Sequence, residues 1–218
     1  MFSVEDATRG SKKPMAARKD GQIKQEESIC MKCVRSTEII TDTYQLGDII
    51  SFKLKTGEPM EAMAVKKEED GMIFCSVDCL EKEYPLQKNG DYSDGYEKSD
   101  LRKKLRSIVK DFPSDLVESM VPFDNGDYLR IPTEKEIFGK NEYGVPENDT
   151  VEQFEPMKQR RNRIAFQGLN GPWEWYWLQN RAVYSASGAC GVSGGGGAGS
   201  LSASYGLGVR PLFKIKNQ

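Results

Sequence analysis

A stretch of small residues near the end of the sequence most restricts how this chain can fold. Between residues 185 and 208, nine glycines, six serines and four alanines make up nineteen of twenty-four positions. This composition is usual in flexible linkers, but only twelve residues follow Gly206. The stretch is also bounded by "EWYWLQN" and "GVRPLFKI", which are rich in strand-forming residues. We therefore predict that residues 187–206 are ordered, as surface strands and loops across a folded scaffold.

The remaining pattern predicts a mixed α+β domain. Strand signals come first, helix signals follow, and strands return, which argues against an alternating parallel sheet. The clearest helix covers residues 100–112, where apolar residues recur on one face, Ser99 or Asp100 can cap the first turn, and Pro113 ends it. The other predicted elements are strands at residues 46–54, 61–69, 71–80, 129–131, 160–166, 174–180 and 208–215, a short helix at 114–121, and a loop at 139–158.

Two further patterns predict local structure. Thr133 and Glu136 fit a capping box, in which the hydroxyl meets one helical amide and the carboxylate reaches back to another. In "WEWYWL", strand alternation places Trp173, Trp175 and Trp177 on one face. We expect Trp175 and Trp177 to anchor the core.

The first part of the chain differs from the rest. Residues 1–40 are polar, mixed in charge and poor in large apolar side chains, so we predict a poorly ordered arm that is dispensable for folding. Residues 41–218 then form one domain. The first residues include acidic side chains where a signal peptide needs an apolar core, and no apolar run is long enough to span a bilayer. We expect a protein that is cytoplasmic when synthesised.

Charge and residue usage exclude several function classes. The net charge of -2 gives no general attraction for nucleic acid, and the basic run "RRNR" at residues 160–163 is interpreted as the solvated start of a strand. The chain has no histidine, so Ser-His and Cys-His catalysis are excluded. We predict no nucleic-acid partner, no catalytic residue and no cofactor.

The cysteines leave one metal question open. Cys30 and Cys33 have the spacing of a zinc ligand pair, whereas Cys75 and Cys79 are separated by one residue too many for a zinc knuckle. Cys75 and Cys79 also lie in a predicted strand, where small buried residues are common. We favour buried cysteines over a zinc site and predict no metal.

Some amino acids are missing from the small-residue stretch. Residues 180–209 contain no Lys, Glu, Gln, Trp or Met, all of which the rest of the chain uses. These five are the amino acids that codons ending in a pyrimidine cannot encode. The pattern is compatible with chance in a segment so rich in Gly and Ser, and also with codons of one restricted type.

At these residues the chain resembles a known family. "LGDIISF", "SDLRKKL", "LRIPTEKEIFG", "RRNRIAF", the "WYWL" strand and the closing "GVRP" are similar to phage and prophage proteins of unknown function, over about residues 44–216. That family resembles the C-type-lectin-fold variable proteins of diversity-generating retroelements, in which error-prone reverse transcription at template adenines rewrites codons near the 3′ end of a gene. The resemblance implies a C-type-lectin-like α+β fold, which is also the fold of formylglycine-generating enzymes.

The resemblance also implies fixed and diversified positions. The fixed ones are Trp175, Trp177, Ser185, Ala186, Val192, Gly196, Ala198, Ala203, Ser204 and residues 208–211. The candidate ligand-binding positions, in a displayed region of about residues 180–209, are Tyr184, Gly188, Gly191, Ser193, Gly195, Gly197, Gly199, Ser200, Leu201, Tyr205 and Leu207. We expect the non-fixed positions within residues 187–206 to form one contiguous exposed face, whose residue types matter little for folding. Many are Gly or Ser, whereas binding versions often carry Tyr, Asn, Asp or Arg.

Three readings of function follow. The first is a non-enzymatic ligand-binding protein of phage or prophage origin with a diversified C-terminal surface, joined to a virion, to another component or to a second copy through its arm. The second is a prophage structural or interaction protein without diversification. The third is an oxidoreductase related to formylglycine-generating enzymes, which need a reactive cysteine pair at a copper site, whereas only Cys190 lies in the matching region.

Overall fold

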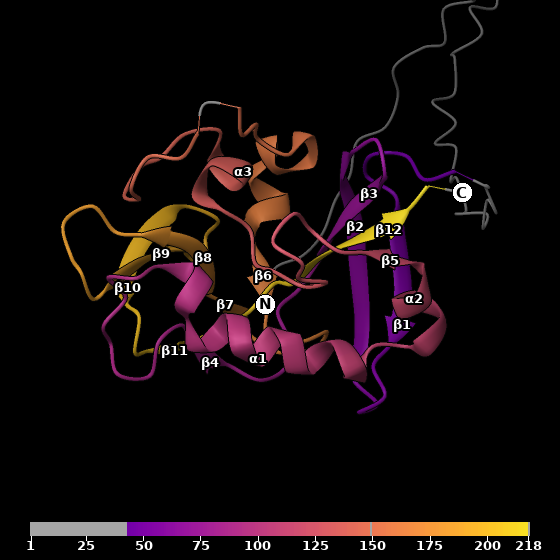
Figure 1. Ribbon diagram of the computed structural model, residues 1–218, viewed down its shortest axis with the longest axis horizontal. Helices are drawn as coiled ribbons and strands as arrows, with labels where there is room; N and C mark the ends of the chain where they lie inside the picture. Colours follow the sequence, from indigo (N-terminus) through magenta and orange to yellow (C-terminus); the bar gives the residue numbers. More distant parts are fainter. Residues whose placement is uncertain (1–42, 149, 218) are drawn as a thin grey trace, which may run out of the picture. The chain divides into compact units, whose positions relative to one another are not determined.

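The computed structural model describes residues 43–148 and 150–217, whose largest sheet contains five antiparallel strands (Figure 1). These strands are β1 (Ile49–Lys53), β2 (Pro59–Lys67), β3 (Gly71–Ser76), β5 (Met120–Val121) and β12 (Leu212–Lys216). Their order is β1-β2-β3-β12-β5. The last strand of the chain therefore lies inside the sheet that the first strands begin, between β3 and β5.

A second antiparallel sheet contains the small-residue stretch. It consists of β8 (Tyr176–Arg181), β9 (Gly188–Val192) and β10 (Ala198–Ser202), in the order β10-β9-β8. Two short strand pairs complete the β structure: β4 (Tyr84–Pro85) with β11 (Gly206–Leu207), and β6 (Ala165–Phe166) with β7 (Trp173–Glu174). The prediction that residues 187–206 are ordered strands and loops is confirmed.

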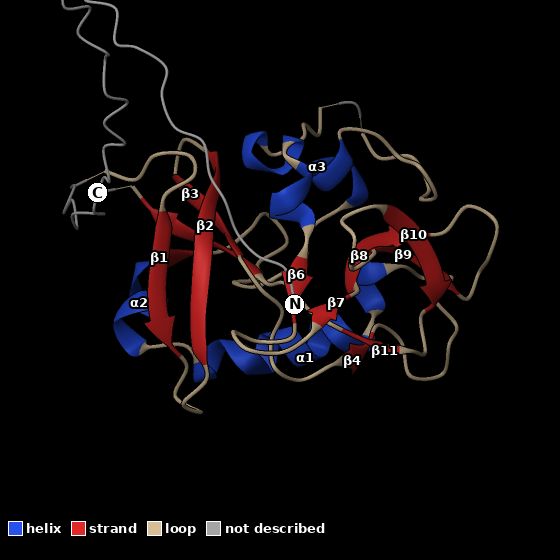
Figure 2. Cartoon of the chain, turned by 180° about the vertical axis from the view of Figure 1, so that it is seen from behind, coloured by secondary structure: helices blue, strands red, loops and turns tan. Residues whose placement is uncertain are grey.

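The helices are few and short, as expected for the predicted mixed α+β class. They are α1 (Asp100–Ile108), α2 (Ser114–Ser119) and α3 (Glu134–Phe138), with the 3-10 helices η1 (Tyr96–Lys98), η2 (Val109–Asp111), η3 (Glu155–Lys158) and η4 (Arg160–Arg163). Helix α1 begins near β4 and β11 and runs toward the five-stranded sheet (Figure 2). Ser99 caps α1 by accepting the Arg102 N–H at 3.1 Å. The capping box is confirmed at α3, with Thr133 and Glu136 exchanging both hydrogen bonds.

Buried side chains form two clusters, one on each side of the central strands. The first core cluster includes Phe74, Phe112, Trp177 and Phe213, and the second includes Ile73, Tyr176, Leu178 and Cys190. Strand β3 contributes Phe74 to one cluster and its neighbour Ile73 to the other, because successive side chains of a strand point to opposite faces. Strand β8 does the same with Trp177 and Tyr176. Both sheets are therefore covered on both faces at their centres.

The predicted single tryptophan face is wrong. Trp177 is fully buried, Trp175 is partly buried, and Trp173 is 61% exposed. The strand breaks at Trp175, which lies between β7 and β8, so the three side chains do not follow one continuous alternation. Of the two expected core anchors, only Trp177 is fully buried in the core.

Two predicted strands are also replaced by other structure. Residues 160–166 begin as the 3-10 helix η4 and contribute only the two residues of β6 to a sheet. The Asn162 side chain donates to the Pro156 carbonyl at 2.7 Å, which helps to hold the tight turn. Residues 129–131 make a single bridge between Arg130 and Leu212, and the predicted loop at residues 139–158 ends in η3.

Other predictions depend on what the structure describes. No helix within residues 43–148 and 150–217 is long and apolar enough to cross a membrane. The predicted N-terminal arm, with Cys30 and Cys33, lies outside the described residues.

Candidate functional site

A groove at one end of the three-stranded sheet brings together several predicted ligand-binding positions. It has a volume of about 270 Å³ and is formed by the loop after α3, the β8–β9 turn and strand β10. We call it the Tyr184 groove, and it is lined by Tyr143, Ala182, Tyr184, Ser185, Ser187, Gly188, Ser200, Leu201 and Ser202. Tyr184, Gly188, Ser200 and Leu201 belong to the predicted set. No charged side chain lines the groove.

The β8–β9 turn holds Tyr184 in solvent on a well-bonded backbone. The Ala182 N–H donates to the Gly188 carbonyl at 2.9 Å, and the Val183 N–H donates to the Tyr143 carbonyl at 2.8 Å. The side chain of Tyr184 nevertheless remains 94% exposed. A large aromatic side chain on a fixed turn offers contact area to a partner without ordering the backbone first.

Two pairs of serine hydroxyls lie in the groove or next to it. The Oγ atoms of Ser185 and Ser187 lie 3.1 Å apart, and those of Ser202 and Ser204 lie 3.0 Å apart. A hydroxyl donates one hydrogen bond and accepts two, so each pair keeps capacity for a ligand. The groove is therefore suited to an uncharged polar ligand surface with an apolar part that packs on the tyrosine ring.

A buried carboxylate supports the Tyr143 wall of the groove. Glu134 is fully buried, and its carboxylate accepts the N–H groups of Tyr143 at 3.0 Å and Gly144 at 2.8 Å. The Glu134 N–H donates in turn to Asn180 Oδ1 at 2.6 Å. Burial, together with the neighbouring Glu134, raises the pKa of the Cys190 thiol. The thiol therefore stays protonated at neutral pH and contributes to packing.

The glycine loop between β9 and β10 is fastened by the basic run. Arg160 Nε donates to the Gly195 carbonyl at 2.7 Å, and Arg163 Nε donates to the Gly196 carbonyl at 3.1 Å. Gly196 has a φ of +75°, a conformation that favours glycine. The interpretation of "RRNR" as the solvated start of a strand is corrected in its strand assignment, because these residues form the 3-10 helix η4. Arg160 and Arg161 are exposed as expected, while Arg160 and Arg163 also donate to the carbonyl groups of residues 195 and 196.

Tryptophan rings lie directly on two glycines of the stretch. A Cβ atom on Gly194 would lie 1.9 Å from Trp173 Cε3, and one on Gly199 would lie 2.8 Å from Trp175 Cζ3. Real Cβ contacts are longer than 3.0 Å, so any side chain here would force a ring to move. Glycine is therefore favoured by close packing at Gly199, where the Trp175 ring is partly buried, whereas the exposed Trp173 ring can move away from Gly194 more easily.

The predicted binding positions do not form one exposed face, which corrects the expectation. Among them, Tyr184, Gly195, Ser200 and Tyr205 are exposed, Ser193, Gly197, Gly199, Leu201 and Leu207 are partly buried, and Gly188 and Gly191 are buried. The reason is that β9 is the central strand of its sheet and packs on both faces. A Cβ on Gly191 would lie 3.0 Å from the Tyr176 carbonyl oxygen, and a Cβ on Gly188 would lie 3.0 Å from the Ala182 Cβ, so substitution there requires neighbours to shift.

Sequence reasoning gave no role to Arg210 of the "GVRP" motif. Arg210 is 2% exposed, and its Nε donates to the Ser76 carbonyl at 2.9 Å. Its Nη1 donates to the Asn162 carbonyl and to the Tyr176 hydroxyl, each at 3.1 Å. Arg210 thus ties β3, η4 and β8 together, and the motif has a structural role. The sequence pointed to Arg210 only through the family resemblance, which implies that residues 208–211 are fixed, and through a charged residue next to an apolar C-terminal strand pattern.

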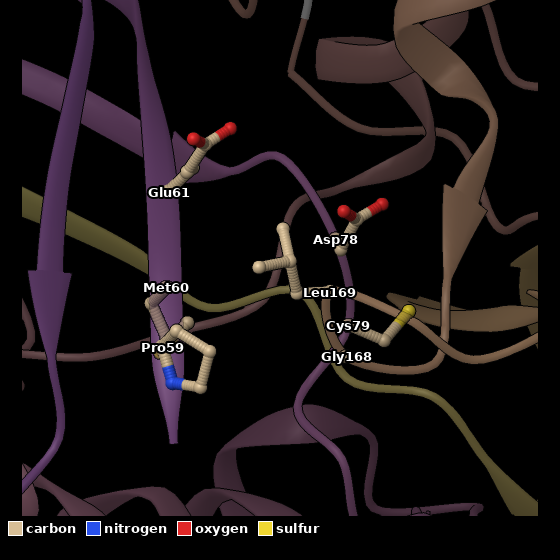
Figure 3. A pocket seen from close by; sticks show the side chains of 7 residues that line it. All are labelled: Pro59, Met60, Glu61, Asp78, Cys79, Gly168 and Leu169. Atoms are coloured by element: carbon tan, nitrogen blue, oxygen red, sulfur yellow. The ribbon is translucent and has the colours of Figure 1, made fainter. Parts of the chain in front are cut away.

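A small pocket beside Cys79 has too little room for a substrate. It has a volume of about 10 Å³, roughly enough for one water molecule. Figure 3 shows the side chains around it, with the Glu61 and Asp78 carboxylates held apart from the Cys79 sulfur atom. Burial raises the pKa of the Cys79 thiol, so this cysteine is also protonated at neutral pH.

The cysteine metal hypothesis finds no support in the part of the chain that the structure describes. Cys75 and Cys79 are buried free thiols, and no group of three or more His, Cys, Asp or Glu side chains within residues 43–148 and 150–217 is placed to hold a metal ion. Cys30 and Cys33 lie outside those residues.

Comparison of the chain with models of known protein families, with curated proteins and with solved structures gives no match.

Proposed function

We propose that this protein is a non-enzymatic binding module that holds its ligand in the Tyr184 groove. The observation that carries the proposal is the 94% exposure of Tyr184 on an ordered turn. Such a side chain is suited to an interface, since tyrosine gives a large, amphipathic contact surface at low entropic cost. The serine pairs beside it supply adaptable hydrogen bonds, which is the second requirement of a binding surface.

The proposal includes a C-type-lectin-like fold and a phage or prophage origin. The mixed α+β architecture and the return of β12 between β3 and β5 support this reading of the fold. We propose that diversification, if it occurs in this gene, acts mainly at exposed positions such as Tyr184, Ser200 and Tyr205. The buried glycines of β9 are poor sites for it. The prophage interaction protein without diversification is the alternative.

The oxidoreductase reading is the weakest of the three. It needs a reactive thiolate, whereas burial and the neighbouring Glu134 raise the pKa of the Cys190 thiol. The Glu134 carboxylate instead secures the loop at Tyr143 and Gly144. These contacts give Cys190 and Glu134 a structural role and favour the binding proposal.

A peptide library displayed on phage and selected on the immobilised protein tests the proposal. We expect selected peptides to lose about tenfold to thirtyfold in affinity for Tyr184→Ser, the range typical of an aromatic residue at the centre of an interface. Ser200→Lys should also weaken them. The matched control is Tyr128→Ser, since Tyr128 is 40% exposed and lies outside the groove. Failure to select peptides, or equal affinity for all variants, would reject the groove as the binding site.

Diversification has its own test in the source genome. We expect a reverse transcriptase gene nearby and a near-copy of the segment that encodes residues 180–209, differing at adenines. Absence of both would favour the prophage interaction protein without diversification and would leave the peptide experiment unaffected.

A further inference from the structure

A second groove lies between the segment around β4 and the first turns of α1, two elements that are neighbours in Figure 1, and it shares no lining residue with the Tyr184 groove. Its volume is about 600 Å³, within the range of roughly 300–1,000 Å³ that is usual for small-molecule sites. Four of its lining residues are lysines and two are acidic: Lys82, Lys88, Lys103, Lys104, Glu83 and Asp100.

Only one lysine of this groove forms an ion pair within the described residues, although the charge of Lys88 also helps to lower the pKa of Asp100. Lys103 pairs with Asp100 at 3.3 Å. Within residues 43–148 and 150–217, no carboxylate lies within ion-pair distance of Lys82, Lys88 or Lys104. The chain as a whole has a net charge of -2, so this local excess of positive charge does not follow from its overall composition.

The two acidic residues of the groove offset only part of its positive charge. The Asp100 carboxylate accepts the Lys88 N–H at 3.2 Å in addition to its ion pair with Lys103. Glu83 interacts with Glu174, and the pKa of Glu174 is raised by burial first and by Glu83 second. Asp100 is thus bonded to Lys88 and Lys103, and the four lysines of the lining still outnumber its two carboxylates.

Two of these ammonium groups, those of Lys82 and Lys104, lie near one tyrosine ring. Lys82 Nζ and Lys104 Nζ are each 5.6 Å from the centroid of the Tyr84 ring. The Tyr84 carbonyl accepts the Trp177 indole N–H at 2.9 Å, which ties the ring to the core. An exposed cation–π contact contributes only about 0.5–1 kcal/mol, so both ammonium groups can leave the ring for a stronger anionic partner.

The phenol of Tyr84 provides a further donor. Its pKa is raised by burial first and then by the carboxylates of Glu58 and Asp111. The hydroxyl therefore stays protonated and can donate a hydrogen bond at neutral pH.

Hydrogen bonds hold the two walls of the groove together. The Leu101 N–H donates to the Leu86 carbonyl at 3.2 Å, and the Asp100 N–H donates to Gln87 Oε1 at 3.0 Å. These bonds join the start of α1 to the segment that follows β4. The groove is thus formed before any ligand binds, which lowers the entropic cost of binding.

We propose that this groove binds a small organic phosphate that carries a flat ring, such as a nucleoside diphosphate. Lys82 and Lys104 contact the phosphates, because a lysine ammonium acts as a point charge for phosphate oxygens. Tyr84 and Pro85 offer the apolar surface on which the ring packs. The groove is larger than inorganic phosphate alone requires. Its apolar lining would also remain uncovered if the ligand were purely anionic.

Calorimetric titration with ADP, pyrophosphate, adenosine and a hexaglutamate peptide at low salt tests this site. We expect ADP to bind more tightly than adenosine or pyrophosphate. The affinity for ADP should fall with added salt, because salt screens the lysine charges. The double variant Lys82→Gln/Lys104→Gln should lower ADP affinity by about tenfold or more. Tyr84→Leu should reduce the preference for ADP over pyrophosphate, with near-ultraviolet circular dichroism confirming that each variant is folded.

The matched control is the double variant Lys67→Gln/Lys216→Gln, which removes two exposed lysines outside the groove. It should bind ADP like the native chain. Three results would overturn the proposal: no ADP binding at millimolar concentration, equal loss of affinity in both double variants, or binding of hexaglutamate but not ADP. The last result would assign the groove to an acidic peptide segment.

Discussion

The region of small residues around β9 and β10 contains two parts that differ both in composition and in surroundings. The packed part, residues 191–199, lies against tryptophan rings and arginine side chains. The open part, residues 184–187 and 200–202, lines the Tyr184 groove. Glycines predominate in the packed part and serines in the open part. Glycine is used here where large neighbours come close, and serine where the surface meets solvent.

This difference changes what the stretch can be used for. At four glycines of the packed part an added Cβ meets a ring or a backbone oxygen, so variation there costs stability: Gly191, Gly194, Gly196 and Gly199. In the open part, Tyr184 and Ser200 are exposed, and variation there alters only the surface offered to a ligand. A binding surface can therefore vary at a few positions while the scaffold beneath it stays constant.

The largest loss of stability is expected for Trp177, which pairs with the packed part from the neighbouring strand. Trp177 is paired with Gly191 across β8 and β9, is fully buried, and donates its indole N–H to the Tyr84 carbonyl. Trp177→Ala should lower the free energy of unfolding by about 3–5 kcal/mol, measured by urea denaturation. Trp173→Ala is the control, because Trp173 is 61% exposed and should lose much less. Similar losses for both would mean that the packed part depends on the tryptophans equally.

A smaller loss of stability is expected for substitutions in strand β10, where the packed and open parts meet. Gly199 faces the Trp175 ring, whereas its neighbour Ser200 is exposed. Gly199→Val should lower the free energy of unfolding by about 1–3 kcal/mol through overpacking. Ser200→Val should change it by no more than about 0.5 kcal/mol. Equal effects at the two positions would remove the distinction between the parts.

Local sequence signals predicted most of the secondary structure. The cap at Ser99, the capping box at Thr133 and Glu136, and the strands that became β1, β2, β3 and β12 all depend on short-range patterns. The ordered state of residues 187–206 was also predictable, because strand-forming segments lie on both sides. These features follow from contacts close in the sequence or from simple alternation.

Features that depend on distant partners were not predictable. Glycine composition does not show which glycines will have a tryptophan above them, as Gly199 has Trp175. Neither does "RRNR" reveal that Arg160 and Arg163 bind carbonyl groups more than thirty residues away. For the same reason the candidate positions were placed on one face, although β9 buries Gly191 and Cys190.

Loss of the hydrogen bonds that Arg163 makes to the glycine loop is expected to lower stability moderately. Arg163 donates to the Gly196 carbonyl at 3.1 Å and to the Met157 carbonyl at 2.8 Å. Arg163→Met should lower the free energy of unfolding by about 1.5 kcal/mol, the lower end of the range for hydrogen bonds to a charged group. The control is Arg161→Met, since Arg161 is exposed and should change stability little. If Arg163→Met were as stable as the native chain, the packed part would not depend on the hydrogen bonds of Arg163.

The smallest effect on stability is expected at Tyr184, the residue that most clearly belongs to the open part. Its side chain is 94% exposed, while the turn beneath it is fixed by backbone hydrogen bonds of Ala182 and Val183 that do not involve the ring. Tyr184→Ser should therefore change the free energy of unfolding by no more than about 0.5 kcal/mol. The same substitution should abolish or strongly weaken the binding of peptides selected on the native chain, which separates a surface role from a structural one. Chemical denaturation and peptide titration on one preparation measure both quantities. A loss of stability well above 1 kcal/mol would place Tyr184 in the packed part and would remove the main support for the groove as a ligand site.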